Sequence, residues 1–301
     1  MPRFGPYEVE ALIGKGGMAE VYRARAVEGR FEGRRVALKR LLPELAKDPH
    51  YVDLFTGEAD LSRMLNHPNV IQVLEAGVIQ DTYFIAMDLI DGRDLGQILA
   101  RCRARKIQLP IDFAVFLVKS LLEALDHAHN LTAPSGKVLV VVHCDVSPSN
   151  LFISRVGEIK LGDFGIAKVR SLEAAGGPNK VFGKAYYLSP EQLDGVLEPS
   201  VDLWAAAVTL YELLTLERPF QGTSADEVAR KIRKGAFTPI STLRPEVYPP
   251  LVETLRGALD VDPSRRFGSA RAFADALVPH YNELIGTPLA IAAVVRGLFG
   301  A

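Results

Sequence analysis

The hydrophobic period of this chain changes once, near residue 90. Before that point, short segments alternate apolar and polar residues as half-buried strands do, at 7–9, 20–24, 36–39 and 82–87. One segment with helical spacing interrupts them at 52–65, and Asn66-His67-Pro68-Asn69 ends it. Beyond residue 92 the patterns become long and helical, notably over 111–129 and 200–216. We therefore predict an α+β fold, in which a small strand-rich lobe with one main helix precedes a larger, mostly helical lobe.

Composition and charge exclude several classes of function. The 35 Lys and Arg residues nearly balance 36 Asp and Glu residues, so no overall field would attract nucleic acid. The longest apolar stretch, 288–295, is far shorter than the ~20 residues that span a bilayer. Cys102 and Cys144 are too few for a disulfide framework or a zinc site, and the first residues lack a signal-peptide core. We expect a cytoplasmic protein with no nucleic-acid partner and no membrane span in this chain.

A glycine-rich segment, Gly14-Lys15-Gly16-Gly17, lies between two strand patterns. Backbone amides in such a loop can close over phosphate groups, although most glycine-rich hairpins are simply turns. A Rossmann fingerprint would need a helix directly after the glycines. Here a strand pattern follows, so the dinucleotide interpretation is disfavoured.

Charged residues at two further positions fit a phosphate site. Lys39 ends the apolar segment Val36-Ala37-Leu38-Lys39, and Glu58 lies in the helical segment at 52–65. An ion pair between them would aim the ammonium group at nucleotide phosphates. Each residue taken alone is more often a solvated surface charge.

The strongest signal is a pair of apolar segments that carry oxygen-bearing side chains. Asp145 and Asn150 lie on a loop within 140–153, and Asp163 follows at hairpin distance in Gly162-Asp163-Phe164-Gly165. The three side chains could share one site for Mg²⁺, which takes oxygen ligands and accompanies phosphate. The alternative is that they are ordinary turn residues.

These motifs, in this order and followed by Ser189-Pro190-Glu191, resemble those of the protein kinase family. The resemblance runs from about 7 to 280 and is greatest to the eukaryotic-like serine/threonine kinases of bacteria. It implies the bilobal protein-kinase fold, with an antiparallel-sheet N-lobe at 1–88, a helical C-lobe at 89–280 and a hinge at about 88–92. The remaining 281–301 form a C-terminal extension, which either packs on the helical lobe or leads into further domains.

The resemblance also implies a reaction, the transfer of the γ-phosphoryl group of ATP to Ser or Thr hydroxyls of protein substrates. Lys39, paired with Glu58, would hold the α- and β-phosphates. Asn150 and Asp163 would bind Mg²⁺, with Mn²⁺ as a possible substitute, and Asp145 would orient the substrate hydroxyl and accept its proton.

Further residues are implied to surround the nucleotide. Met87 resembles the gatekeeper, the backbone of Asp88 and Ile90 the hinge that pairs with adenine, and Asp94 the acid near the ribose. The glycine loop and the apolar walls around the base would comprise Ile13, Gly14, Gly16, Val21, Ala37 and Phe152. Two structural elements are implied as well: Asp202-Leu203-Trp204 would anchor the catalytic loop, and Arg266 would pair with Glu191. For Trp204 itself, core packing is the expected role.

Four positions depart from the family pattern. Ala19 replaces the third glycine, which is a mild change. Cys144 replaces an arginine that reads a phosphate on the activation segment, so we expect activity without phosphorylation of that segment. Ser147 replaces a lysine near the transferred group, while Lys184 stands where a threonine is usual.

The last two changes are explained either as one exchange or as two separate events. In the first case Lys184 is a catalytic residue that supplies the positive charge absent at Ser147; in the second it is a solvated lysine. The same losses raise an alternative function, a pseudokinase that binds nucleotide or partner proteins as a scaffold. A small-molecule kinase is a third interpretation, but it predicts a remodelled docking segment, whereas Ser189-Pro190-Glu191 keeps the protein-kinase pattern.

Overall fold

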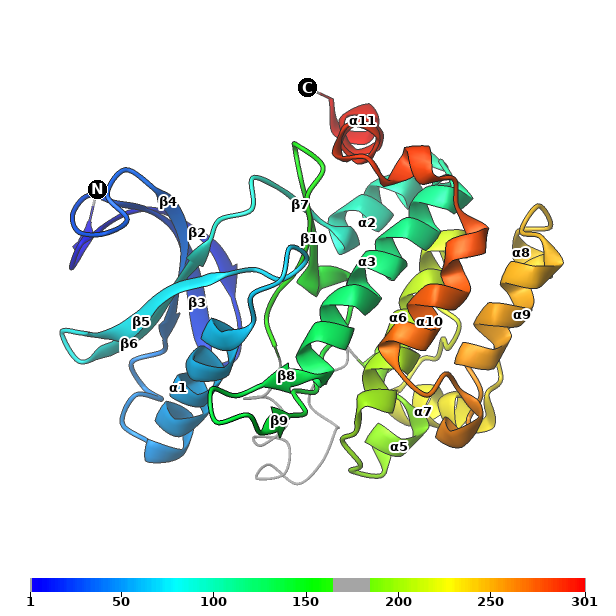
Figure 1. The fold of residues 1–301 in the computed structure, drawn as a ribbon, viewed down its shortest axis with the longest axis horizontal. Helices are drawn as coiled ribbons and strands as arrows, with labels where there is room; N and C mark the ends of the chain where they lie inside the picture. Colours follow the sequence, from blue (N-terminus) through cyan, green and yellow to red (C-terminus); the bar gives the residue numbers. More distant parts are fainter. Residues whose placement is uncertain (1, 165–184, 301) are drawn as a thin grey trace.

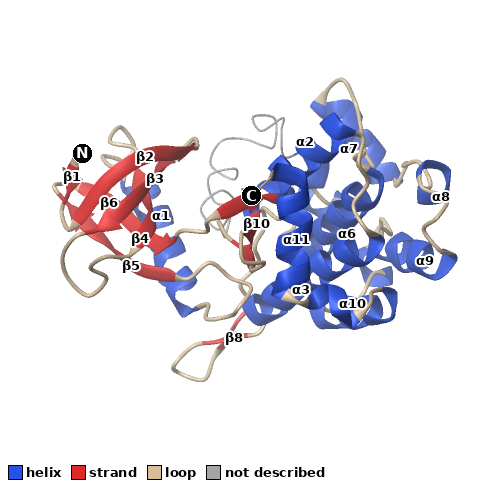
Figure 2. Ribbon diagram, turned by 90° about the horizontal axis from the view of Figure 1, so that it is seen from above, coloured by secondary structure: helices blue, strands red, loops and turns tan. Residues whose placement is uncertain are grey.

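The computed structural model describes residues 2–164 and 185–300, which form two lobes side by side (Figure 1). The N-lobe contains a six-stranded antiparallel sheet in the order β1-β2-β3-β4-β6-β5. Its strands are β1 (Arg3–Phe4), β2 (Tyr7–Lys15), β3 (Ala19–Ala26), β4 (Arg35–Leu41), β5 (Val73–Ile79) and β6 (Thr82–Asp88). Strands gather in this lobe and helices in the other (Figure 2), which confirms the predicted α+β architecture.

Helix α1 (Pro49–Met64) packs against the sheet of the N-lobe. Asp48 caps its first turn by accepting a hydrogen bond from the His50 N–H at 3.0 Å, and Pro49 is tolerated where no intrahelical N–H is needed. The helix begins three residues before the predicted 52–65 because this cap lies there. Phe55 and Ala59 are buried among residues of the sheet, which include Ala19, Leu41, Val73 and Ile85.

The C-lobe is built around α3 (Ile111–His129) and α6 (Pro199–Thr215), which are buried on most sides. A helix that is apolar all round belongs in a core. Trp204 of α6 is fully buried and stacks on Phe220 with ring centres 5.4 Å apart, so its core-packing role is confirmed. Among the described residues, the other α-helices of the lobe are α2 (Leu95–Arg105), α5 (Pro190–Leu193), α7 (Ala225–Lys234), α8 (Ile240–Leu243), α9 (Pro249–Ala258), α10 (Ala270–Leu277) and α11 (Pro288–Phe299).

A three-stranded sheet lies on the side of the C-lobe nearest the N-lobe (Figures 1 and 2), in the order β11-β10-β7. Its strands are β7 (Gly92–Asp94), β10 (Leu151–Ser154) and β11 (Ile159–Leu161), and a separate short hairpin joins β8 (Leu131–Thr132) to β9 (Val138–Leu139). The Leu161 N–H donates to the Asn69 carbonyl oxygen, and the Ile71 N–H donates to that of Leu161, both at 2.8 Å. The segment after α1 is thereby hydrogen-bonded to the C-lobe.

Besides the short strands β1, β7, β8 and β9, which no pattern indicated, two longer elements were not predicted. Strand β5 was missed because it has a single buried residue, Val73, and contains Gly77. The extension, for which no secondary structure was predicted, contains a helix at 288–299 whose buried residues follow the helical period: Ile291, Ala292, Val295 and Leu298. Among the described residues, none of the helices is long and apolar enough to cross a membrane.

Candidate active site

Lys39 on β4 connects the two lobes through its side chain. Its Nζ forms an ion pair with Glu58 of α1 and lies 3.4 Å from Oδ1 of Asp163 in the C-lobe. The side chains of Lys39 and Glu58 are only 11% and 8% exposed. Burial by itself would lower the pKa of Lys39, but the carboxylates of Glu58 and Asp163 outweigh it and raise that pKa. The ammonium is therefore charged at neutral pH and fixed between α1 and the C-lobe.

Strand register places the predicted wall residues around Lys39. Val21 is directly opposite Lys39, and Ala37, two residues away on the same face, is opposite Met87. Gly14 is opposite Val21 in the β2–β3 hairpin, next to the half-exposed Ile13. In the small sheet of the C-lobe, Phe152 and Asp94 are opposite each other.

The glycine turn closes with a hydrogen bond from the Gly16 N–H to the Ala19 carbonyl oxygen at 2.8 Å. Ala19, which departs from the family pattern, is 5% exposed and packs with Leu41 and Phe55 in the lobe core. The methyl group thus occupies the interior of the lobe. The turn leads into strand β3, as the sequence predicted, and no Rossmann helix follows it.

The segment between the lobes presents backbone groups at the positions expected for the hinge. The Asp88 N–H donates to the Gln72 carbonyl oxygen at 3.0 Å, and its carboxylate pairs with Arg34 at 2.5 Å. The Ile90 N–H makes no hydrogen bond to the backbone of the described residues. Asp94 caps α2 by accepting from the Gln97 N–H at 2.9 Å, and burial raises the pKa of its carboxyl group. The Ile90 N–H is therefore a donor that a bound base could use.

The buried carboxylate of Asp202, at the start of α6, holds the loop that carries Asp145. Its Oδ2 accepts from the His143 N–H and its Oδ1 from the Cys144 N–H, both at 2.8 Å, while His129 Nε2 lies 2.9 Å from Oδ2. Cys144 has a φ of 61°, a backbone conformation that non-glycine residues rarely adopt. Three groups contact the Asp202 carboxylate and hold the loop in place, so the surrounding structure maintains this rarely adopted backbone conformation. The anchoring role expected for Asp202 is thus present in the contacts.

The ring of His143 orients the backbone of Asp145. The Asp145 N–H donates to His143 Nδ1 at 3.2 Å, so Nε2 carries the proton and donates to the Gly162 carbonyl oxygen at 3.1 Å. His143 is fully buried, and its ring centre lies 4.6 Å from that of Phe164. Through these two hydrogen bonds, the neutral ring of His143 links Asp145 to Gly162, the residue before Asp163.

The oxygen-bearing side chains predicted to bind metal lie together. Asn150 Nδ2 donates to the Asp145 carbonyl oxygen at 2.8 Å and to its Oδ2 at 3.1 Å, so Oδ1 of Asn150 is the atom suited to be a metal ligand. The Gly162 N–H donates to the Asn150 carbonyl oxygen at 2.9 Å, which places Asp163 beside Asn150. Among the described residues, no group of three His, Cys, Asp or Glu side chains forms a metal cage. The residues nevertheless fit Mg²⁺, which commonly takes one or two protein oxygens and completes its shell with water and phosphate.

The catalytic loop carries two of the departures from the family pattern. Ser147 is 4% exposed, and its Oγ lies 3.1 Å from Ser149 Oγ, so a hydroxyl pair occupies this part of the loop. Burial raises the pKa of the Cys144 thiol, which is therefore neutral at physiological pH. Lys184 lies outside the described residues.

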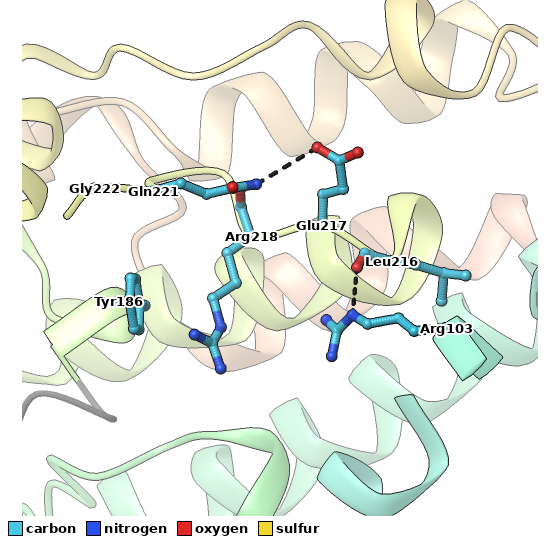
Figure 3. Close-up of a pocket in the computed structure, with 7 residues that line it drawn as sticks. All are labelled: Arg103, Tyr186, Leu216, Glu217, Arg218, Gln221 and Gly222. Atoms are coloured by element: carbon cyan, nitrogen blue, oxygen red, sulfur yellow. Dashed lines mark hydrogen bonds between the residues drawn. The ribbon is translucent and has the colours of Figure 1, made fainter. Parts of the chain in front are cut away.

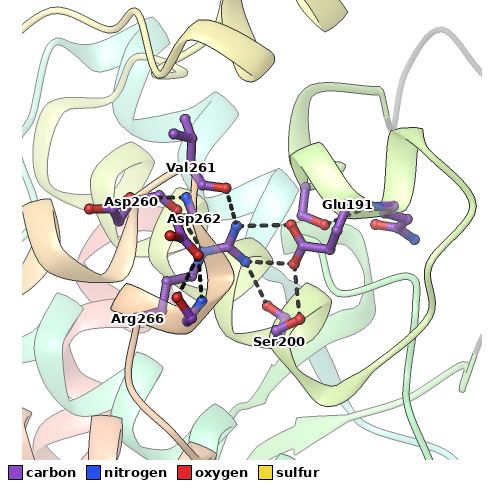
Figure 4. A network of polar contacts seen from close by, with 9 residues as sticks. Glu191, Ser200, Asp260, Val261, Asp262 and Arg266 are labelled. Atoms are coloured by element: carbon purple, nitrogen blue, oxygen red, sulfur yellow. Dashed lines mark hydrogen bonds and ion pairs between the residues drawn. The ribbon is translucent and has the colours of Figure 1, made fainter.

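Glu191 and Arg266 form the buried ion pair that the resemblance implied (Figure 4). Arg266 binds both carboxylate oxygens, at 2.6 and 2.8 Å, and its Nε donates to the Asp260 carbonyl oxygen at 2.7 Å. The Arg266 guanidinium also lies 4.7 Å from the ring centre of Trp204. The pair fastens α5 to the turn before α10, and it lowers the pKa of Glu191 against the opposing effect of burial.

A cavity of about 540 Å³ lies at the C-terminal ends of α2 and α6 (Figure 3). The Arg103 Nε donates to the Leu216 carbonyl oxygen at 2.6 Å, and the Arg218 guanidinium lies 4.2 Å from the ring centre of Tyr186. Its lining, among the described residues, includes none of the predicted nucleotide-site residues. We therefore do not assign the nucleotide to this cavity.

Sequence reasoning missed three residues that hold the site: His129, His143 and Gln192. The Gln192 Nε2 donates to the Cys144 carbonyl oxygen at 3.0 Å, which ties α5 to the catalytic loop. For His143 a signal was available in the sequence, because it lies two residues before Asp145. His129 and Gln192 act through contacts between distant segments, and no local pattern marks them.

Comparison with known proteins agrees with this geometry. Residues 7–278 match the family model described as protein kinase domain. The chain is 35% identical over 300 residues to tyrosine-protein kinase MasK of Myxococcus xanthus, covering 99% of this chain and 46% of MasK. It is 34% identical over 279 residues to serine/threonine-protein kinase PknA of Mycobacterium tuberculosis, covering 91% of this chain and 61% of PknA. For serine/threonine-protein kinase PrkC of Bacillus subtilis the identity is 32% over 267 residues, covering 88% and 39%.

Solved structures show the same fold. The crystal structure of the Mycobacterium tuberculosis PknI kinase domain superposes with a TM-score of 0.66 at 29% identity, covering 93% of this chain and 98% of that one. The chain spans less than two thirds of the length of the three curated relatives named above. The order of the motifs, the two lobes and these matches lead to one conclusion: the chain belongs to the protein kinase domain family, among the eukaryotic-like kinases of bacteria.

Proposed function

We propose that this chain is an active, Mg²⁺-dependent kinase that transfers the γ-phosphoryl group of ATP to Ser and Thr hydroxyls of protein substrates. The observation that carries the proposal is the continuous set of contacts that joins the five polar residues of the site. Lys39 contacts Glu58 and Asp163, and Asn150 contacts Asp145. The hydrogen bond from Gly162 to Asn150 connects the two groups.

Each of these residues has a role that its contacts support. The Lys39 ammonium, kept charged by Glu58, would bind the α- and β-phosphate oxygens. Asn150 Oδ1 and the Asp163 carboxylate would hold Mg²⁺, which when bound neutralises charge on the phosphate oxygens. Asp145, oriented by Asn150 and His143, would accept the proton of the substrate hydroxyl.

The nucleotide would lie between the lobes. The base would pack between Ala37, Val21 and Phe152 and pair with the backbone of Asp88 and Ile90, while the ribose would approach Asp94. The raised pKa of Asp94 supports this placement, because it indicates a carboxyl group that is partly shielded from water and available to a ribose hydroxyl. We place this activity in the cytoplasm, where ATP is present and the free thiols of Cys102 and Cys144 stay reduced.

Two departures favour the pseudokinase as the second candidate. Neither the Ser147 hydroxyl nor the Cys144 thiol can supply the positive charge that the family pattern has at these positions. Positioning and electrostatic stabilisation by the other five residues remain, and they supply most of phosphoryl-transfer catalysis. The active kinase is therefore the function we propose.

Incubation of the purified chain with labelled ATP, Mg²⁺ and separate Ser, Thr and Tyr peptides tests this function. We expect label on Ser and Thr peptides, loss of transfer with EDTA, and loss with the matched variant Asp145→Asn. The Tyr peptide is included because MasK is named a tyrosine kinase whereas PknA and PrkC are named serine/threonine kinases. ATP binding without transfer would identify the pseudokinase, and label on the Tyr peptide alone would overturn the acceptor class.

A further inference from the structure

The C-terminal helix α11 is part of the C-lobe core. Ile291, Val295 and Leu298 are buried within it, and Phe299 packs against its edge. The helix lies beside α2 and β10, on the side of the C-lobe where the small three-stranded sheet lies (Figures 1 and 2). This placement brings it to the strands that carry the proposed nucleotide site.

The first residue of α11 touches the turn between β10 and β11. Gly157, in that turn, has a φ of +89°, and a Cβ atom added to it would lie 1.9 Å from the Pro288 carbonyl oxygen. The backbones of the turn and the helix are therefore in direct contact. No side chain separates them at this point.

The last turn of α11 contacts β7 and α2 through two arginines. The guanidinium of Arg93, on β7, lies 5.2 Å from the ring centre of Phe299, and that of Arg101, on α2, lies 5.9 Å from it. The Arg101 Nε also donates to the Leu298 carbonyl oxygen at 3.0 Å. The ring of Phe299 thus contacts β7, which ends at Asp94, and α2, which begins directly after Asp94.

The strand that Phe299 contacts needs such support. β7 has three residues and, in the part of the chain that the structure describes, lies at the edge of its sheet and pairs with β10 alone. Arg93 is directly before Asp94, which caps α2 and is opposite Phe152. A displacement of β7 would therefore move Asp94, which is next to the proposed ribose position. It would also alter the position of Asp94 relative to Phe152, which belongs to the apolar wall around the proposed base position.

We propose that α11 is a positioning element of the nucleotide site, in which Phe299 fixes β7 through Arg93. The proposal rests on the nucleotide site of the proposed function, but it does not depend on phosphotransfer. A guanidinium over an aromatic face is attracted to the ring, and removal of the Phe299 ring loses this attraction for both arginines. We expect an affinity change of about threefold to tenfold, which corresponds to about 0.7 to 1.4 kcal/mol.

Equilibrium titration of the 301-residue chain with MgATP tests this inference. We expect Phe299→Ala to raise the Kd for MgATP by about threefold to tenfold, with kcat at saturating MgATP within about twofold of the parent. Leu289→Ala is the matched control, because Leu289 belongs to the same helix and is 73% exposed. It should leave the Kd unchanged.

A second variant keeps the test independent of overall stability. Val228→Ala in α7 removes a buried side chain of the same lobe far along the chain from β7, and it provides a protein with a lowered Tm. If Val228→Ala raises the Kd as much as Phe299→Ala does, the effect is general loosening and the inference is wrong.

The contact with Arg93 is tested from its other side. Arg93→Gln should raise the Kd by no more than Phe299→Ala does, and the double variant should bind no more weakly than Phe299→Ala, because Phe299→Ala already removes the contact with Arg93. Additive effects, or an unchanged Kd in Phe299→Ala, would overturn the inference and leave the proposed kinase function standing. A parent chain that binds no MgATP would overturn both.

Discussion

Lys39 carries the positive charge that pairs with the carboxylates of Glu58 and Asp163 in the site. It is buried, yet the carboxylates of Glu58 and Asp163 keep it ionised. Its removal would take away the ammonium group that forms an ion pair with the buried Glu58. Catalytic and structural effects of substitutions here must therefore be measured separately.

We predict that Lys39→Met and Asp163→Asn each lower single-turnover phosphotransfer by more than about a hundredfold, because each removes a charge aligned with phosphate or metal. Lys47→Met, an exposed lysine in the same lobe, is the matched control and should stay within about twofold of the parent. Tm measurements on all three variants identify any loss that comes from unfolding. Near-normal transfer by either site variant would remove that residue from the mechanism.

Ser147 raises a question of charge at the same scale. The structure places its hydroxyl beside that of Ser149, and the family pattern has a lysine there. Our hypothesis from the sequence is that Lys184, which lies outside the described residues, supplies the absent charge.

A double-mutant cycle tests this exchange. Lys184→Thr should lose about 2 to 4 kcal/mol of transition-state stabilisation, and Ser147→Lys in that background should recover much of it. The four proteins are compared by single-turnover phosphotransfer at saturating ATP and Mg²⁺. A Lys184→Thr variant within about threefold of the parent, or effects that simply add, would show that Lys184 has no catalytic share.

At the scale of elements, much of the site follows from local sequence. The strands around Lys39 follow from alternation, whereas the start of α1, which Asp48 and Pro49 determine, lies three residues before the predicted one. Strand β5 was missed because a glycine interrupts it, and for α11 no secondary structure was predicted. Contacts between elements were beyond any local pattern: nothing near His129 in the sequence indicates that it meets Asp202.

The ion pair between Glu191 and Arg266 joins two such elements and has a pH dependence. Because the pKa of Glu191 is lowered from its ordinary value of 4.5, its contribution to stability is complete above that pH and is lost as the pH falls through the folded-state value. We predict that Glu191→Gln, which leaves the buried Arg266 charge unpaired, costs about 3 kcal/mol at pH 7.

Urea unfolding at several pH values measures this difference. The stabilities of the parent and Glu191→Gln should begin to converge as the pH falls below about 4.5 and should be closest below the folded-state pKa of Glu191, where the parent has lost the same carboxylate charge. The exposed Glu253, which pairs with Arg256 on the surface, offers a matched control, and Glu253→Gln should change stability by less than about 1 kcal/mol. A gap between the parent and Glu191→Gln that is constant from pH 7 to pH 4 would contradict the assignment.

At the scale of the whole molecule, the two lobes meet through contacts that include the Lys39–Asp163 ion pair and the backbone hydrogen bonds of Leu161 with Asn69 and Ile71. The family resemblance predicted both lobes and the hinge position, whereas the β7–β10–β11 sheet of the C-lobe, with α11 against it, came only from the structure. The contacts of β7 with β10 and of α11 with the β10–β11 turn join residues that are 58 or more positions apart, as in the pairing of Phe152 with Asp94 and of Pro288 with Gly157, so sequence periodicity carries no record of them.

The contact between β7 and β10 has an evolutionary consequence. A Cβ atom on Gly92 would lie 1.9 Å from the Ile153 carbonyl oxygen and 2.7 Å from the Cα of Ser154, so glycine is the one residue type that lets β7 pair with β10. Loops on either side can lengthen, shorten or change in composition as the sequence diverges. Position 92 must remain glycine while these loops change. In a descendant with any other residue there, strand β7, which ends at Asp94, must have separated from strand β10, which follows Asn150.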